Sequence, residues 1–257
     1  MSGSLRALIF DVDGTLAETE EAHRQAFNTA FARAGKNWHW TPMVYRSLLR
    51  VAGGKERIAH WCETQHIDLS QRDIAELHSV KTRAYADLLA NGLPLRPGVK
   101  RLINQALEAR LPLAIATTTT PANIDALLAP HFGKDWKALF QSIKAGNSVP
   151  NKKPAGDVYT AALQELAIDG HEAVAFEDSR IGVAAANAAG IPVVATPSHF
   201  WDDDDFTAAD VVLEDLGEKD ATWRDSHEHF ARRYLDLPGL QAWHQRHITN
   251  SATGVAP

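Results

Sequence analysis

The stretch Asp11-Val-Asp-Gly-Thr-Leu16 directly follows a largely apolar run at residues 5–10. Residues two apart near the end of a strand project in the same direction, so Asp11 and Asp13 can share one pocket while the valine between them points elsewhere. Gly14 lets the backbone turn close to a ligand. Taken alone, this stretch would also suit a strand followed by an acidic turn that caps a helix. The choice between the two interpretations depends on residues further along the chain.

Similar apolar runs recur along the chain, and most of them end in polar residues. They cover residues 113–116, 173–176 and 192–195, with weaker candidates at 138–143 and 211–213. Runs without polar alternation are typical of strands that are buried on both faces of a parallel sheet. Stretches of helical length lie between them, at residues 98–109, 122–129, 157–166 and 180–189. This alternation predicts an α/β fold with a doubly wound, Rossmann-like parallel sheet.

About a hundred residues separate the first two apolar runs, although a crossover between parallel strands needs only about a dozen or more. Apolar residues in this excess recur near a 3.6-residue period, at residues 20–34, 43–50, 55–65 and 71–90. We therefore expect a small α-helical cap domain at residues 16–96. It would be inserted into an α/β core formed by residues 1–15 and 97–257.

The last forty residues or so follow the final predicted strand and carry many aromatic and apolar side chains. These are Trp223, Phe230, Tyr234, Leu237, Leu240 and Trp243. They suggest helix faces that dock on the core or on another subunit, and so a C-terminal helical extension from about residue 216. The same region contains His227, His229, His244 and His247, whose spacing is more typical of surface residues than of a metal site.

The composition is that of an ordinary globular chain: 257 residues, 45% of them hydrophobic and 23% charged, with a net charge of −6. These values exclude disordered, collagen-like and coiled-coil classes. No apolar run is long enough to span a bilayer, and no basic stripe indicates nucleic-acid binding. The single cysteine, Cys62, and the absence of room for a signal peptide favour a cytoplasmic protein. We expect a monomer, with a dimer as the alternative.

Further polar residues follow the predicted strands or precede a helix on the same side of the sheet. Thr117 follows the second run, Glu177 and Asp178 follow a later one, and Lys153 precedes a predicted helix. Ligands of open parallel sheets bind beyond the carboxyl ends of the strands. Clustered carboxylates there imply a divalent cation, and Mg²⁺ suits oxygen ligands. A phosphoryl group whose oxygens bind the cation, Lys153 and Thr117 would complete the charge balance.

Read in order, four short segments resemble the motifs of phosphatases of the haloacid dehalogenase (HAD) superfamily. They are Asp11-Val-Asp-Gly-Thr15, Ala116-Thr-Thr118, Lys152-Lys-Pro154 and Glu177-Asp-Ser179. The resemblance covers about residues 5 to 215, and the inserted helical segment resembles the subclass that carries a helical cap. It implies the same doubly wound core and a Mg²⁺-dependent phosphoric monoester hydrolase.

The resemblance also implies a role for each motif residue. Asp11 would be the nucleophile that becomes an aspartyl phosphate, and Asp13 would be the general acid and base. Thr117 would bind a phosphoryl oxygen, and Lys153 would neutralise the nucleophile and the transferring group. Lys152 is the alternative for this role, but the Lys-Pro dipeptide favours Lys153.

The same resemblance implies how the metal would be held. Mg²⁺ would bind the side chains of Asp11 and Asp178 and the backbone carbonyl of Asp13. Glu177 would orient a metal-bound water rather than bind the ion directly.

Within the capped subclass, several segments resemble the CbbY-type xylulose-1,5-bisphosphate phosphatases. They are Glu18 with Glu20 and His23, the loop Gly53-Gly-Lys-Glu-Arg57, Lys81, and Leu95-Arg-Pro-Gly98. The implied substrate is a small sugar phosphate, most specifically xylulose-1,5-bisphosphate, which would be hydrolysed to xylulose 5-phosphate. In a carbon-fixing cell this would remove an inhibitor of Rubisco.

A bisphosphate needs a second cationic pocket, which the cap could provide. The substrate-binding residues expected on this basis are Glu18, His23, Tyr45, Arg46, Gly53, Gly54, Lys55, Arg57, Lys81, Thr118 and Thr119. The alternative for the cap cations is that they are solvated charges of helix faces.

Two other functions use nearly the same groups. A phosphomutase of the β-phosphoglucomutase type shares the aspartate pair, the cap and a histidine at the position of His23. A phospho-receiver signalling module also combines acidic residues, a threonine and a lysine around an aspartate. Its acidic pair precedes the phosphorylated aspartate and it has no cap, so the sequence disfavours it. Glu18 and the Gly-Gly-Lys-Glu-Arg loop favour hydrolysis over mutase activity.

Overall fold

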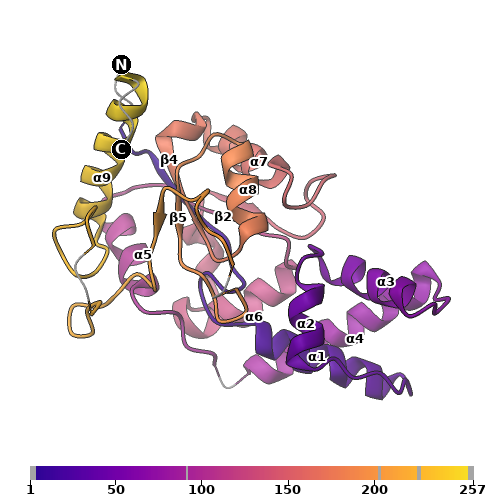
Figure 1. Ribbon diagram of the computed structural model, residues 1–257. Helices are drawn as coiled ribbons and strands as arrows, with labels where there is room; N and C mark the ends of the chain where they lie inside the picture. The colour runs from indigo at the N-terminus through magenta and orange to yellow at the C-terminus, as the bar shows by residue number, and fades with distance from the viewer. Residues whose placement is uncertain (1–3, 91, 202–203, 225–226, 254–257) are drawn as a thin grey trace.

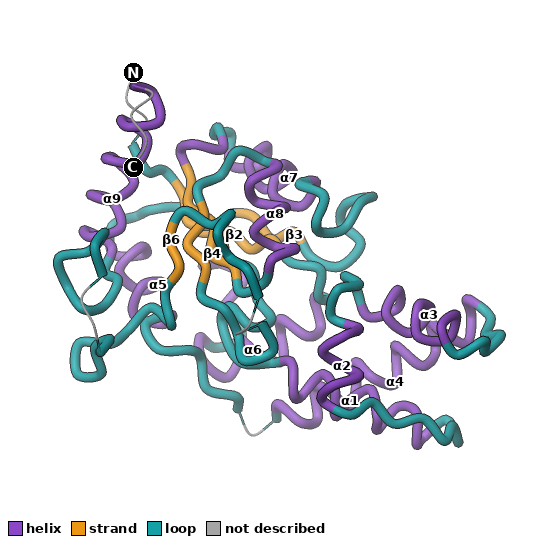
Figure 2. Tube along the Cα trace, viewed as in Figure 1, coloured by secondary structure: helices purple, strands orange, loops and turns teal. Residues whose placement is uncertain are grey.

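The computed structural model describes residues 4–90, 92–201, 204–224 and 227–253. Within these residues, six parallel strands form one sheet in the order β3-β2-β1-β4-β5-β6. The strands are β1 (Ala7–Phe10), β2 (Leu113–Ala116), β3 (Ser142–Lys144), β4 (Ala173–Glu177), β5 (Val193–Ala195) and β6 (Val211–Val212). Figure 2 shows them in orange at the centre of the molecule. The predicted α/β fold with a doubly wound parallel sheet is therefore confirmed.

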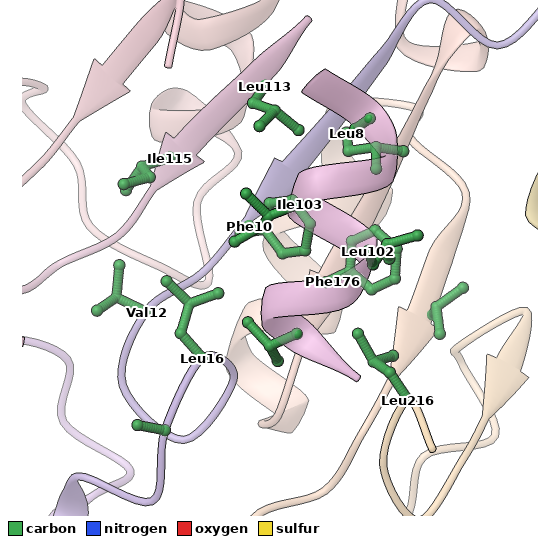
Figure 3. Close-up of a cluster of buried hydrophobic side chains, with 14 of the residues drawn as sticks. Leu8, Phe10, Val12, Leu16, Leu102, Ile103, Leu113, Ile115, Phe176 and Leu216 are labelled. Atoms are coloured by element: carbon green, nitrogen blue, oxygen red, sulfur yellow. The ribbon is translucent and has the colours of Figure 1, made fainter. Parts of the chain in front are cut away.

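Helices cover both faces of this sheet. The strands are therefore buried on both sides, and their sequences are continuous apolar runs. Leu8 and Phe10 of β1 face α5 (Val99–Glu108), whose Leu102 and Ile103 pack on them (Figure 3). The helices α6 (Pro121–Phe132) and α9 (Leu237–Thr253) add to this cluster. The alternate β1 residues belong to the opposite cluster, with α7 (Asp157–Leu166) and α8 (Arg180–Ala188). Two short 3₁₀ turns, η1 (Trp136–Leu139) and η2 (Gly170–Glu172), connect elements of the core.

Among the described residues, four helices lie between β1 and α5 in the sequence and form the cap. They are α1 (Glu20–Arg33), α2 (Pro42–Leu48), α3 (Gly54–Thr64) and α4 (Gln71–Leu89). Figure 1 shows them together at the lower right, beside the sheet. Aromatic rings hold the cap together: the ring of Trp40 lies 4.6 Å from that of Phe27 and 4.9 Å from that of Phe31, centroid to centroid. We propose domain boundaries at residues 15–16 and 96–97, where the chain enters and leaves this group of helices.

The two chain crossings between the core and the cap are adjacent in space. The backbone N–H of Arg96, in the returning segment, donates to the carbonyl of Leu16, in the outgoing segment, over 2.8 Å. The two covalent connections between cap and core therefore lie side by side, close to the end of β1.

Two predicted elements differ from the structure. Residues 138–143 do not form one strand, because η1 occupies the first part and β3 pairs with β2 only from Ser142. No helix begins near residue 216 in the described part of the chain: residues 217–224 and 227–236 are non-helical, and α9 starts at Leu237. It starts there because the Asp236 carboxylate accepts the backbone N–H of Gly239, as an N-cap does. Trp223, Phe230 and Tyr234 are nevertheless buried.

None of the helices in the described residues combines the length and the apolar character that crossing a membrane requires.

Candidate active site

A buried lysine joins two carboxylates at the carboxyl end of the sheet. The Lys153 ammonium donates to Oδ1 of Asp11, at the end of β1, and to Oε1 of Glu177, at the end of β4, over 2.6 Å each. The Tyr159 hydroxyl also donates to Glu177 Oε1, and the other carboxylate oxygen accepts a backbone N–H. Burial disfavours the ammonium, but the two carboxylates raise the pKa of Lys153 above its ordinary value. The lysine therefore stays charged beside Asp11.

Asp178 completes an acidic cluster with Asp11 and Glu177. Each of the three has a carboxylate oxygen that lies within 4.8 Å of the others. Burial raises the pKa of Asp11 to about 7, although Lys153 opposes the shift. Burial and the neighbouring negative charges raise the pKa of Asp178 well above its ordinary value, while a hydrogen bond from Ser198 over 2.6 Å favours the ionised form. These buried oxygens fit a hard divalent cation, which would offset the unfavourable charge.

Asp13 is turned toward the cap and belongs to a separate hydrogen-bonded chain. Its Oδ1 accepts from the Thr19 hydroxyl and from Nε2 of His23, over 2.8 Å each. The ammonium of Lys81, on α4, lies 2.6 Å from Nδ1 of His23. Burial alone would raise the pKa of Asp13, but His23, Thr19 and Lys81 lower it overall. Burial lowers the pKa of Lys81 to about 7. Residues of the cap thus set the charge of a carboxylate that the core supplies.

A second polar network lies in the cap, facing the strand ends. The Tyr45 hydroxyl donates to Oε2 of the buried Glu20 over 2.7 Å and accepts from Nη1 of Arg57 over 2.9 Å. Arg57 also donates to the carbonyl of Leu48. Burial lowers the pKa of His78 to about 3, and the nearby lysines act in the same direction. The imidazole of His78 is therefore neutral at pH 7 and sits beside several cations.

An ion pair connects the cap directly to the core. The ammonium of Lys152 lies 2.6 Å from Oε1 of Glu56, on α3. The two consecutive lysines thus point to different places: Lys153 to Asp11 and Lys152 to the cap. This geometry favours Lys153 for the lysine role that the sequence left open between them.

A single pocket between the core and the cap brings most of the predicted site residues together. Those that line it are Asp11, Asp13, His23, Gly53, Gly54, Arg57, Lys81, Thr117, Thr118, Thr119, Lys153 and Asp178. Thr117 is buried next to β3, where its N–H donates to the carbonyl of Lys144. Asp11 and Asp178 line the pocket from the core, and Arg57 and Lys81 line it from the cap.

Five predicted residues do not line this pocket. Glu177 lies beneath it, held by Lys153 and Tyr159, and Tyr45 lies behind Glu20. Glu18 turns to the core, where it pairs with Arg96 over 3.5 Å. Lys55 is exposed on α3, and Arg46 lines a separate surface hollow with Arg50. Tyr45 would therefore act on a substrate in the pocket only indirectly, through its partners Glu20 and Arg57.

Several lining residues were not among the site residues predicted from the sequence. They are Glu20, Phe27, Leu49, Ala52, His78, Thr120, Asn123, Ser179, Ile181 and Trp201. For His78 a signal existed: it lies three residues before Lys81 and therefore on the same face of α4. For Trp201 no signal existed, because its loop reaches the cap only in the folded chain.

The fold and this pocket define a capped α/β enzyme that transfers phosphoryl groups. The family model of haloacid dehalogenase-like hydrolases matches residues 5–190. Protein CbbY of Cupriavidus necator is 50% identical over 246 residues, which cover 93% of this chain and 97% of that protein. The chain belongs to the haloacid dehalogenase-like hydrolases, and within them it is a phosphatase of the CbbY type.

Solved structures agree with this assignment. A crystal structure of a CbbY variant from Rhodobacter sphaeroides in complex with xylulose-1,5-bisphosphate has a TM-score of 0.78 and 42% identity, covering 83% of this chain and 96% of that one. A β-phosphoglucomutase from Clostridium difficile has a TM-score of 0.75 at 18% identity, covering 95% of this chain and 99% of that one. The second likeness shows the shared fold.

Proposed function

We propose that this phosphatase hydrolyses xylulose-1,5-bisphosphate to xylulose 5-phosphate, with Mg²⁺ as cofactor. The observation that carries the proposal is the pocket itself, which has Lys153 with its carboxylates on the core side and Arg57 and Lys81 on the cap side. A substrate with a phosphate at each end matches that distribution of charge. Support also comes from the similarity to a CbbY protein crystallised with the same bisphosphate. We place the reaction in the cytoplasm, where the lone Cys62 stays reduced.

The first chemical step takes place on Asp11. A carboxylate oxygen of Asp11 attacks the phosphorus of the phosphate on carbon 1, and the bond between that phosphorus and the sugar oxygen breaks. Lys153, 2.6 Å from Asp11, offsets the negative charge that the two reactants bring together. The hydroxyl of Thr117 and the segment after it bind the other phosphoryl oxygens.

The metal would be held by the carboxylates of Asp11 and Asp178 and by the backbone carbonyl of Asp13. When bound, Mg²⁺ supplies positive charge to the phosphoryl oxygens. Glu177 supports this arrangement through Lys153, because both of its own oxygens already accept hydrogen bonds.

Asp13 transfers a proton in each of the two steps. It gives a proton to the departing sugar oxygen, and it then removes one from the water that attacks the aspartyl phosphate, which releases phosphate and restores Asp11. The hydrogen bonds from Thr19 and His23 both end on Oδ1, so we assign the transferred proton to Oδ2. A phosphate dianion bound beside Asp13 raises its pKa by charge repulsion and so favours the protonated form that the first step needs.

A direct assay tests the proposed function. We expect the purified protein to release inorganic phosphate from xylulose-1,5-bisphosphate, and we expect EDTA to abolish the release and added Mg²⁺ to restore it. Conversion of β-glucose 1-phosphate to glucose 6-phosphate, without net phosphate release, would instead show a phosphomutase. Full activity in the presence of EDTA would contradict the metal assignment.

Replacing Arg57 by Ala should raise the KM for the bisphosphate by about 10- to 100-fold, since a hydrogen bond to a charged group contributes about 1.5–3 kcal/mol. Arg57 is the cap guanidinium that lines the pocket. The matched control is Arg83→Ala, which removes an exposed arginine of α4 that pairs with Ser79 and leaves the pocket intact. Steady-state kinetics measure both variants. An unchanged KM in a folded Arg57→Ala protein would exclude Arg57 from the phosphate pocket.

A further inference from the structure

Arg96 lies outside the pocket, its side chain is only 8% exposed, and its guanidinium donates to four backbone carbonyls. Nη1 of Arg96 donates to the carbonyls of Gly14 over 2.5 Å and Thr196 over 2.6 Å. Nη2 donates to the carbonyls of Pro197 over 3.1 Å and Glu214 over 2.8 Å. Nε lies 3.5 Å from the carboxylate of Glu18. A guanidinium has five N–H groups in a fixed plane. Here Nη1 and Nη2 donate four hydrogen bonds to backbone carbonyls, and the Nε side forms an ion pair with Glu18.

Three of the four accepting carbonyls belong to the loop after β1, which carries Asp13, and to the loop after β5, which carries Ser198. The fourth, that of Glu214, follows β6. Gly14 follows Asp13 and has a φ of +80°, and a side chain at this position would collide with Asp178. Thr196 and Pro197 directly precede Ser198, whose hydroxyl donates to Asp178 over 2.6 Å. The guanidinium thus fixes the loop after β1 relative to the loop after β5.

Arg96 also joins the two crossings between core and cap. Its own backbone N–H donates to the carbonyl of Leu16 in the outgoing crossing, and its side chain pairs with Glu18 in the same segment. Asp13 lies just before that segment and is hydrogen-bonded to Thr19 and His23 just after it. Any shift of the crossings therefore changes where the Asp13 carboxylate points.

We propose that Arg96 is a positioning residue that holds the Asp13 carboxylate against the leaving-group oxygen. It touches neither the substrate nor the reacting atoms, and it acts through the carbonyl of Gly14 and through Glu18. The proposal rests on the proposed function, because it presumes that Asp13 protonates the leaving group. Lysine cannot replace this residue, since a single ammonium lacks the planar set of five donors.

The chain offers a matched control. Arg101, on α5, makes the same kind of contact, donating to the carbonyls of Leu216, Gly217 and Leu235 and to the carboxylate of Glu218. All of these acceptors lie in the C-terminal segment, away from the pocket. Arg101→Lys should therefore cost stability as Arg96→Lys does, without a specific effect on chemistry.

The test compares kcat/KM for two substrates in each variant. A sugar phosphate needs a proton on its leaving oxygen, whereas p-nitrophenyl phosphate releases a stable phenolate without one. We expect Arg96→Lys to lower kcat/KM for the sugar bisphosphate by about 10²-fold and that for p-nitrophenyl phosphate by only a few-fold. The ratio of the two values is independent of the fraction of folded protein, and in Arg101→Lys it should equal that of the wild type.

Two results decide the proposal, measured at a temperature at which the variants are folded. Thermal unfolding, followed by circular dichroism, sets an assay temperature at which both lysine variants are folded. Partial restoration of the substrate ratio in Arg96→Ala by free guanidinium, far below denaturing concentration, would support the positioning role. Equal losses on both substrates in Arg96→Lys would overturn it. If the wild type hydrolyses another sugar phosphate but not the bisphosphate, only the proposed substrate fails, and the ratio is measured with the ester that is hydrolysed.

Discussion

Replacing Asp11 by Asn should lower kcat for phosphate release by about 10⁴-fold or more, because an amide cannot take up the phosphoryl group. The substitution keeps the size of the side chain, and Lys153 keeps Glu177 as its partner. Burial already raises the pKa of Asp11 to about 7, so removing the charge should leave the melting temperature close to that of the wild type. Phosphate release and circular dichroism measure the two expectations.

Mass spectrometry of acid-quenched enzyme gives an independent readout for Asp11. The wild type should carry a phosphoryl group on the peptide that contains Asp11, and the Asn variant should carry none. Asp87→Asn is a suitable control, since the side chain of Asp87 is 72% exposed on α4 and its loss should change neither rate nor phosphorylation. A folded Asp11→Asn enzyme with a kcat within tenfold of the wild type would rule out this nucleophile.

Replacing Asp13 by Asn should lower kcat/KM for the sugar bisphosphate by about 10²- to 10⁴-fold, the usual contribution of acid–base catalysis. The amide oxygen can still accept the hydrogen bonds of Thr19 and His23, so we expect the cap network to remain. The reduction for p-nitrophenyl phosphate should be much smaller, because its leaving group departs without a proton.

Hydrolysis of the aspartyl phosphate provides a second test of the role of Asp13. Without this carboxylate, attack by water on the phosphorylated enzyme is slow, and p-nitrophenol should therefore appear as a burst of about one equivalent before a slow steady state. Rapid-mixing absorbance records the burst. Equal reductions of kcat/KM for both esters, with no burst, would refute the assignment of Asp13 as acid and base.

The sequence predicted the core end of the site well because a parallel sheet imposes its own geometry. The carboxyl ends of parallel strands lie at one edge, so residues that follow β1, β2 and β4 must meet there whatever the rest of the chain does. Asp11, Thr117 and Asp178 all line the same pocket for this reason. Lys153 was expected at the same edge because it precedes a predicted helix, and the resemblance in four motifs then implied its role.

The cap end was harder to predict because side-chain direction there depends on how the helices dock. Lys55 and Arg57 are two residues apart on α3 and therefore point to different sides, and only the arginine lines the pocket. Glu18 is drawn toward the core by Arg96, a contact between segments far apart in the sequence. Glu20 was part of the resemblance but was not predicted as a site residue, because its partner Tyr45 lies on another helix.

The adjacency of Leu16 and Arg96, where the chain leaves and re-enters the core, has an evolutionary consequence. The sheet and its reacting groups are interrupted at one site only, so the intervening helices can diverge, lengthen or be exchanged with little disturbance to the strands. Selectivity for the organic part of the ester can then change while Asp11, Lys153 and Asp178 keep their places at the ends of the strands and loops of the core.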